Sequence, residues 1–512
     1  MKSYWIESIN FPKFSSLNKN ITCDVCIVGG GITGITLAYL LSKKNIKVAL
    51  LEKDRLACST TGNTTAKVTS QHGLFYSYLE NSYGIDYAKR YLEANENSIL
   101  DIENIINEEN INCDFEMQDS YVFTEQTKYI NQIKDEQKTL NKLGFNSEYL
   151  TSVPLPIEVE AAIKFPNQAQ FHPRKYLHGL INCIKNNDGL IFENSAVVDI
   201  KKQNNTYTTF ANNYSVSSKY VVMATKYPFI NIPGFYFMKM YQSTSYAIAV
   251  ETSCELFNGI YINVEVPTMS FRTIKNNGKK LLLIAGSDHK TGAKIDLSNA
   301  YDSLEDIAKK MYPDAVIKYK WNTEDCISLD KLPYVGVYSN LYPNMFVATG
   351  FKKWGITTSN IAAHIICDNI LGIKNINDDL FTSTRVNPIK NSSELKNMIK
   401  ESTYSLVINK CRPVNDADVI NNIIELKQKL PVEQGKIFSI NGKKVGVYKD
   451  KNDTIFAIKP ICSHLGCELS FNNISKTWDC PCHGSRFDYK GNCIYGPSVK
   501  GLAVIDLLNL ND

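Results

Sequence analysis

The sequence predicts a chain in two parts: a Rossmann-like α/β nucleotide-binding fold over most of its length, and a separate small domain at its C-terminus. A glycine-rich stretch at 24–54 has the pattern of a strand, a tight turn, a helix and a second strand. At the other end, residues 462–483 hold two cysteine–histidine pairs that a nucleotide-binding fold does not require. A chain of 512 residues is too long for one hydrophobic core and should divide into two or three domains.

The composition is that of an ordinary globular protein. Hydrophobic residues make up 44% of the chain, charged residues make up 21%, and the net charge is +4. Lysines and arginines are interleaved with acidic residues, so no nucleic-acid-binding surface is expected. The N-terminus lacks the apolar core of a secretory signal, and glycines interrupt the apolar run at 25–41. We therefore expect no transmembrane segment and a cytoplasmic location.

The stretch DVCIVGGGITGITLAYLLSKKNIKVALLEKD (24–54) carries the G-x-G-x-x-G spacing of dinucleotide-binding folds. Gly29 allows the tight turn, Gly31 lets the backbone approach a pyrophosphate, and Gly34 lets the helix pack closely on the strand. The helix N-terminus offers N–H groups to the phosphates, and Glu52 can bond ribose hydroxyls. The expected nucleotide contacts also include the neighbouring residues Ile32, Thr33 and Lys53. NAD and FAD share this fingerprint, so it leaves the nucleotide open.

Three further segments favour FAD. They are the hydroxyl-rich loop STTGNTTAK (59–67), the strand KYVVMATKYP (219–228), and the strand, turn and helix of NMFVATGFKKWGITTSNIAAHIICDNILG (344–372). With these segments, residues 20–375 resemble the D-amino-acid oxidase/glycine oxidase family of FAD-dependent oxidoreductases. In that family the loop lies along the flavin, and the late helix points its N-terminus at the flavin ring. Its dipole stabilises the negative charge that develops there on reduction.

This resemblance implies a domain plan and further FAD contacts. FAD-binding parts are expected at about 20–75, 165–230 and 326–375, and an interleaved α+β substrate domain at about 76–164 and 231–325. The implied contacts are Ser59, Thr60, Thr61 and Gly62 in the loop, Val198, Ala224 and Thr225 in the middle strands, and Gly350, Gly355, Ile356 and Thr357 at the late turn and helix.

Three residues are candidates for the catalytic site. Arg272 lies in an alternating strand pattern, where it could pair bidentately with a substrate carboxylate. The alternative for Arg272 is an exposed strand arginine. Lys67 and Trp354 flank the two loops that resemble flavin-contacting segments. Their alternatives are a solvated lysine and a core tryptophan.

The C-terminal cysteines and histidines have the spacing of a metal site. Cys462 and His464 form C-x-H, and fifteen residues later Cys480 and His483 form C-x-x-H. Two cysteines and two histidines suit either tetrahedral zinc or a Rieske [2Fe–2S] cluster. The loops that contain them, CSHLGC and CPCHGS, closely resemble the Rieske proteins of respiratory bc-type complexes. That resemblance covers residues 430–512 and implies a small all-β domain that holds a [2Fe–2S] cluster.

The Rieske resemblance has further consequences. It implies a disulfide between Cys467 and Cys482, and it makes YGPSVKGL (495–502) the loop that closes over the cluster. Ser485 is expected to donate a hydrogen bond to the cluster, whereas Phe487 stands where high-potential relatives usually have tyrosine. Residues 376–429, between the two modules, are polar and are expected to form a connector.

The two resemblances together imply an FAD-dependent oxidoreductase that takes hydride from an amine or amino-acid-like substrate and passes single electrons through the cluster to an external acceptor, a protein or a quinone. A Rieske oxygenase is one alternative, but it needs a mononuclear iron held by two histidines and a carboxylate. Only 29 residues follow His483, and none of them is histidine. A non-enzymatic electron carrier or redox sensor is the other alternative.

Overall fold

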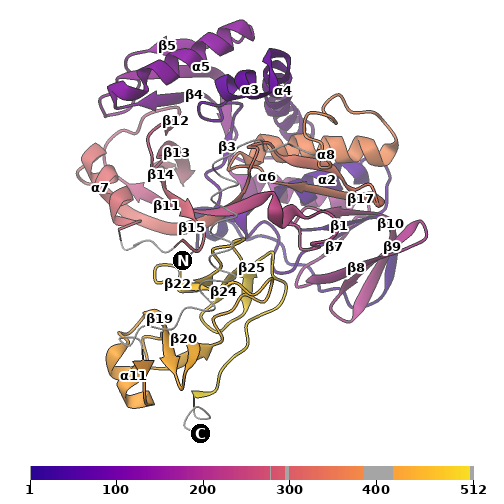
Figure 1. The fold of residues 1–512 in the computed structure, drawn as a ribbon. Helices are drawn as coiled ribbons and strands as arrows, with labels where there is room; N and C mark the ends of the chain where they lie inside the picture. Colours follow the sequence, from indigo (N-terminus) through magenta and orange to yellow (C-terminus); the bar gives the residue numbers. More distant parts are fainter. Residues whose placement is uncertain (1, 277, 294–298, 386–418, 508–512) are drawn as a thin grey trace.

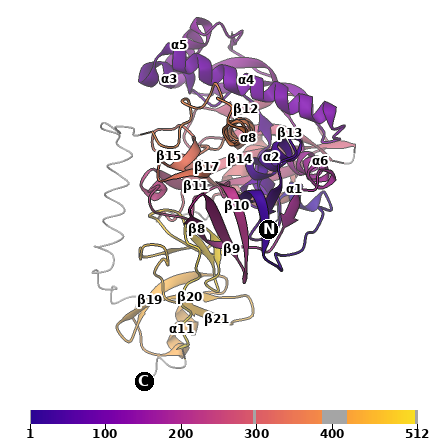
Figure 2. The same cartoon turned by 90° about the vertical axis from the view of Figure 1, so that its right-hand side faces the viewer.

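The computed structural model describes residues 2–276, 278–293, 299–385 and 419–507. A large N-terminal body carries a smaller C-terminal domain on one side, and both views place the smaller domain against the same side (Figure 1, Figure 2). Much of the predicted connector at 376–429 lies outside the described residues.

The first sheet of the large body has the parallel core that a nucleotide-binding fold requires. Within the described residues it has eight strands, in the order β16-β17-β10-β1-β2-β7, with β9 beside β10 and β8 beside β9. The run from β17 to β7 is parallel, so the carboxyl ends of β1 and β2 lie at one edge. The strands are β1 (Ile21–Val28), β2 (Val48–Leu51), β7 (Leu190–Phe192), β8 (Val197–Gln203), β9 (Thr206–Ala211), β10 (Tyr214–Met223), β16 (Tyr334–Ser339) and β17 (Tyr342–Thr349).

Helix α2 (Ile32–Ser42) packs between this sheet and two other helices, α6 (Pro173–Asn186) and α8 (Gly355–Leu371). Nine of its eleven residues are buried, which explains why its sequence is apolar on nearly all sides. A short helix, α1 (Tyr4–Glu7), lies near the start of the chain.

The second sheet of the large body is mostly antiparallel. In the described residues its nine strands run in the order β15-β11-β14-β13-β12-β4-β6-β3, with β5 beside β6; β12 and β4 are parallel. Its strands are β3 (Lys67–Val68), β4 (Glu116–Thr124), β5 (Glu148–Leu150), β6 (Ala161–Gln170), β11 (Met240–Glu251), β12 (Ile260–Asn263), β13 (Ser270–Asn276), β14 (Lys279–Lys290) and β15 (Val316–Ser328). The helices of this part are α3 (Tyr76–Tyr83), α4 (Ile85–Glu108), α5 (Ile130–Lys142) and α7 (Asp302–Met311).

The C-terminal domain consists of two small sheets and a short helix, α11 (Ile423–Lys429). One sheet contains β18 (Val419–Ile420), β19 (Gly435–Ile440), β20 (Lys443–Lys449) and β21 (Ile455–Ile458). The other contains β22 (Ser470–Asn472), β23 (Thr477–Asp479), β24 (Arg486–Asp488) and β25 (Cys493–Tyr495). The sheet that contains β22 to β25 lies next to the large body, and β19 and β20 lie farther away (Figure 1). In the part of the chain that the structure describes, every helix is too short or too polar to cross a bilayer.

Candidate active site and cluster site

A cavity of about 820 Å³ is lined by residues of both large sheets. Its volume is within the range of pockets that hold cofactors and their substrates. Most residues that the sequence pointed to as nucleotide contacts line it: Gly29, Gly31, Ile32, Thr33, Glu52, Lys53, Ser59, Thr60, Thr61, Val198, Ala224, Thr225, Gly350, Gly355 and Ile356. The fold therefore brings the glycine turn, the hydroxyl-rich loop and the start of α8 to one cavity.

The glycine turn fits a bound pyrophosphate. A Cβ atom on Gly29, whose φ is +112°, would lie 2.5 Å from the carbonyl oxygen of Ala224. A Cβ atom on Gly34 would lie 2.0 Å from the carbonyl oxygen of Gly29, so Gly34 permits close helix packing without lining the cavity. Gly31 is the N-cap of α2 and has no side chain to cap it, while the N–H of Ile32 donates to Oγ1 of Thr61 (3.1 Å) in the hydroxyl-rich loop. The start of α2 therefore faces the cavity as an anion-binding helix start does.

The carboxylate of Glu52 is held at the cavity wall by the backbone. It accepts hydrogen bonds from the N–H groups of Gly30 (2.8 Å) and Asp54 (3.0 Å). Burial raises the pKa of Glu52, and the two hydrogen bonds oppose that rise. The backbone thus orients this side chain at the position where the fingerprint expects a ribose.

Four residues suggested by the sequence do not line the cavity: Gly34, Gly62, Arg272 and Thr357. The hydroxyl of Thr357 donates to Oδ1 of Asn95 (2.8 Å), which fixes the first turn of α8 from the side. Arg272 is buried, with 2% of its surface exposed, and its guanidinium donates to the carbonyl of Ala66. The role of Arg272 as a partner of a substrate carboxylate stays a prediction that this placement does not support.

Lys67 and Trp354 both lie at the cavity wall. The Trp354 ring stacks on His72, with 4.6 Å between ring centroids and 20° between planes. Burial, together with the positive charges of Arg272 and Lys353, lowers the pKa of Lys67 to about 7. A lysine with such a pKa can accept a proton near neutral pH.

The four expected cluster ligands converge in the C-terminal domain. Cys462 and Cys480 are free thiols with 3% and 1% of their surface exposed. The rings of His464 and His483 lie 5.1 Å apart, and the Nδ1 atom of each is buried without a hydrogen-bond partner among the described residues. Buried ring nitrogens without a partner are costly unless they bind a metal. The residues therefore fit a cluster bound through two thiolates and two Nδ1 atoms.

Two more features of the Rieske pattern are present. Cys467 and Cys482 form a disulfide, which confirms the expected pairing of the spare cysteines. The Ser485 side chain is hydrogen-bonded to Cys462, and its Oγ atom accepts a hydrogen bond from the N–H of Ser498 (3.1 Å). The loop at 495–502 is thus tied to the ligand loops by Ser485.

Comparison with known proteins identifies both modules. A family model described as FAD dependent oxidoreductase matches residues 24–369. The chain belongs to this family of FAD-dependent oxidoreductases. A second model, described as Rieske [2Fe-2S] domain, matches residues 422–506. The oxidoreductase therefore uses FAD and a [2Fe–2S] cluster, and the residues described above fit both groups.

Individual relatives agree with this assignment. The oxidoreductase is 35% identical over 516 residues to the Rieske 2Fe-2S iron-sulfur protein YhfW of Bacillus subtilis (strain 168), and the alignment covers 99% of this chain and 98% of that protein. Gamma-glutamylputrescine oxidoreductase of Escherichia coli (strain K12) is 27% identical over 229 residues, or 43% of this chain and 53% of that protein. The crystal structure of glycine oxidase from Geobacillus kaustophilus has the same fold, with a TM-score of 0.62 at 16% identity over 72% of this chain and 100% of that chain.

The Rieske domain of this oxidoreductase forms part of the cavity wall. The residues of this domain that line the cavity are Cys493, Tyr495, Gly496, Ser498 and Val499. On the opposite side of the contact, the ammonium group of Lys226 lies 4.1 Å from the centre of the Tyr495 ring. The sequence placed this loop over the cluster but carried no signal that the same loop closes the FAD cavity.

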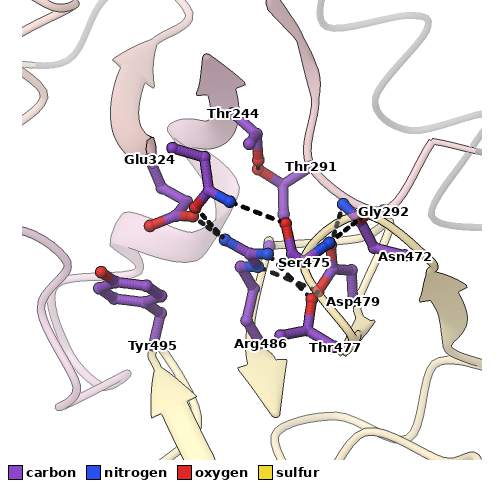
Figure 3. A network of polar contacts seen from close by, with 12 residues as sticks. Thr244, Thr291, Gly292, Glu324, Asn472, Ser475, Thr477, Asp479, Arg486 and Tyr495 are labelled. Carbon is purple, nitrogen blue, oxygen red and sulfur yellow. Dashed lines mark hydrogen bonds and ion pairs between the residues drawn. The ribbon is translucent and has the colours of Figure 1, made fainter. Parts of the chain in front are cut away.

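A buried charge network joins the two domains (Figure 3). Arg486 of β24 forms an ion pair with Glu324 of β15 and a second with Asp479 of β23, where Nε and Oδ1 are 3.0 Å apart. The Arg486 Nη2 group also donates to the hydroxyl of Thr477 (2.9 Å). The side chains of the three charged residues are at most 2% exposed, so the domain interface holds its charges away from water.

Proposed function

We propose that this oxidoreductase oxidises a small amine or amino-acid-like substrate and passes the electrons singly, through the Rieske cluster, to an external one-electron acceptor. The substrate loses a hydride from the carbon next to nitrogen and a proton from the nitrogen, which leaves an imine. FAD supplies hydride chemistry when bound, and the cluster carries one electron at a time. Each substrate therefore reduces two acceptor molecules. A cytoplasmic setting is part of this proposal.

The observation that carries the proposal is the shared wall between the two cofactor sites. Tyr495 and Gly496 belong to the loop beside the cluster ligands, and both line the FAD cavity. The Gly496 carbonyl also shares the side-chain amide of Gln242 with the carbonyl of His483. A Rieske domain that took no part in the reaction at the FAD site would not need to form part of the wall of the FAD cavity.

Two features favour an amine as substrate. One relative is named for gamma-glutamylputrescine, which carries an amino group. At the cavity wall, Lys67 has a pKa near neutrality, so it can take the proton that an ammonium substrate must lose before hydride transfer. The stacked rings of Trp354 and His72 add an apolar surface beside it.

The test begins with anaerobic mixing of the holoprotein with a panel of amines and amino acids, followed by flavin absorbance. A bleaching substrate is then used with the variant His464→Ala. We expect this variant to lose the cluster signal and keep flavin bleaching, while reduction of cytochrome c falls strongly. The matched control is His178→Ala, a histidine of α6 remote from the cluster, which should keep all three signals.

Two outcomes would contradict the proposal. Full reduction of cytochrome c by the cluster-free His464→Ala variant would show that electrons do not pass through the Rieske domain. A flavin that no substrate bleaches would favour a non-enzymatic carrier or sensor.

A further inference from the structure

The histidine edge of the Rieske domain packs on the FAD-bearing body, with His483 buried and His464 partly exposed. Nε2 of His464 donates to Oδ1 of Asn231, 2.9 Å away. The ring of Phe237 meets the rings of both His464 and His483 edge-on, with centroids 5.8 Å and 5.6 Å apart. Asn231 and Phe237 both belong to the segment that leads from β10 into β11.

Gln242 on β11 is hydrogen-bonded to the ligand loops. Its Nε2 atom donates to the carbonyls of His483 (3.0 Å), Gly484 (3.0 Å) and Gly496 (2.6 Å). Three carbonyls can only accept, so they select the amide end of this side chain. The contact is also sterically tight: a Cβ atom on Gly484 would lie 2.5 Å from Cβ of Gln242.

The neighbours of Gln242 along the strand face the cavity. Tyr241, Ser243 and Ser245 line it, whereas Gln242 and Thr244 do not. This alternation is the ordinary two-residue period of a strand. Residues 241–245 of β11 thus present one face to the FAD cavity and the other to the cluster loops. Tyr246, which follows a register shift after Thr244, lines the cavity as well.

We infer that Gln242 and Asn231 are positioning residues that dock the histidine edge of the Rieske domain onto β11, and that this edge faces the chain's own FAD site rather than an external quinol. The inference rests on the proposed relay and deepens it by naming the contact through which the two sites are coupled. A quinol that binds at this edge would need access to His464 Nε2, and Asn231 occupies that nitrogen.

The test compares Gln242→Leu with Gln170→Leu. Leucine keeps the bulk of glutamine but cannot donate to the three carbonyls. Gln170 is the matched control, because it is also a buried glutamine on a strand, with 3% of its surface exposed. Its amide donates to Glu116 (3.0 Å), and both residues are distant in sequence from the cluster loops. Asn231→Leu is a second test variant, which removes only the acceptor of His464.

Two signals are followed in holoprotein with checked iron and FAD content. The first is the EPR spectrum of the dithionite-reduced cluster. The second is the rate at which the cluster is reduced after the FAD is photoreduced by a light flash, with EDTA as the electron donor. We expect Gln242→Leu to slow this rate by about tenfold or more, because several buried hydrogen bonds that fix the loop are lost. We expect Gln242→Leu and Asn231→Leu to shift the EPR spectrum and Gln170→Leu to leave both signals unchanged.

The outcomes separate this inference from the relay. If wild-type cluster stays oxidised after FAD is reduced, the relay fails, and the EPR shifts alone decide the docking inference. Wild-type EPR spectra in both Gln242→Leu and Asn231→Leu would overturn it. If Gln242→Leu does not assemble, Asn231→Leu decides: a shifted spectrum supports the docking and a wild-type spectrum overturns it.

Discussion

At the scale of single residues, two positions in CPCHGSRFD are expected to set the midpoint potential of the cluster. The Ser485 side chain is hydrogen-bonded to Cys462. Phe487 is fully buried in the group of apolar side chains that also contains Cys462, and it has no hydroxyl. Hydrogen bonds to cluster sulfurs favour the reduced, more negative cluster and so raise its potential. For one electron, about 59 mV corresponds to roughly 1.4 kcal/mol, and part of a charged hydrogen bond of about 1.5–3 kcal/mol differs between redox states.

We therefore expect Phe487→Tyr to raise the midpoint potential by about 50–100 mV and Ser485→Ala to lower it by a similar amount. EPR-monitored potentiometry of the two variants measures both changes. An unchanged potential in Phe487→Tyr would mean that the new hydroxyl points away from the cluster, and the account of its tuning would then be wrong.

Lys67 gives a pH-dependent prediction. Its pKa is lowered from the ordinary value of 10.5 to about 7, so the side chain loses its proton as pH rises through about 7. Since only the neutral amine accepts a proton, flavin reduction by an amine should speed up across this pH range. In Lys67→Met this rise should be absent, while Lys275→Met, on the half-exposed end of β13, should retain it. An identical pH profile in Lys67→Met, measured by stopped-flow bleaching, would remove Lys67 from the catalytic site.

At the scale of elements, the loop after β14 meets a ligand loop of the cluster. A Cβ atom on Gly292 would lie 2.5 Å from the backbone nitrogen of Pro481 and 2.6 Å from the carbonyl carbon of Cys480. Gly278 is a matched control, since it too has a positive φ but no atom near the position of a Cβ. Each alanine variant should be destabilised by about 1–2 kcal/mol, because alanine disfavours the left-handed backbone conformation. Gly292→Ala should also push the ligand loop away and speed iron extraction by a chelator; equal extraction rates in both variants would argue against a close contact.

The elements that are local in sequence could be predicted, and the contacts between them could not. The strand, glycine turn and helix at 24–54 and the four cluster ligands follow from short-range spacing. The structure forms the first as a βαβ unit at the cavity and brings Cys462 to Cys480 and His464 to His483. Gln242 is different, because its partners lie more than 240 residues away and a glutamine beside the serines and threonine of β11 has no distinctive pattern. Arg272 shows the converse: its strand is recognisable in the sequence, but the direction of its side chain depends on a hydrogen bond to the carbonyl of Ala66, which lies 206 residues away.

At the scale of the whole molecule, three buried charges hold the Rieske domain against the FAD-bearing body. Arg486 pairs with Glu324 across the interface and with Asp479 inside its own domain. Taking charges out of water is costly, and removal of one partner of a buried pair typically costs about 3–5 kcal/mol because the other charge is left uncompensated. The stability of the interface therefore depends on which of these three charged side chains is removed.

We expect Arg486→Met to destabilise the docked Rieske domain more than Glu324→Gln, because it leaves two buried carboxylates, whereas Glu324→Gln leaves Arg486 paired with Asp479. Burial already raises the pKa of Asp479 to about 7, and loss of the Arg486 charge should raise it further. Since the pKa of the folded Asp479 carboxyl exceeds its unfolded value, the stability that its protonation provides is lost as pH rises. The loss of stability in Arg486→Met should thus be larger at about pH 8 than at about pH 5.

This loss is measured by following the visible circular dichroism of the iron–sulfur cluster during urea unfolding. The control is Lys309→Met, in the exposed Lys309–Glu305 pair, which should change stability by less than about 0.5 kcal/mol. Equal losses at both pH values would show that the Asp479 carboxyl is not what the arginine stabilises.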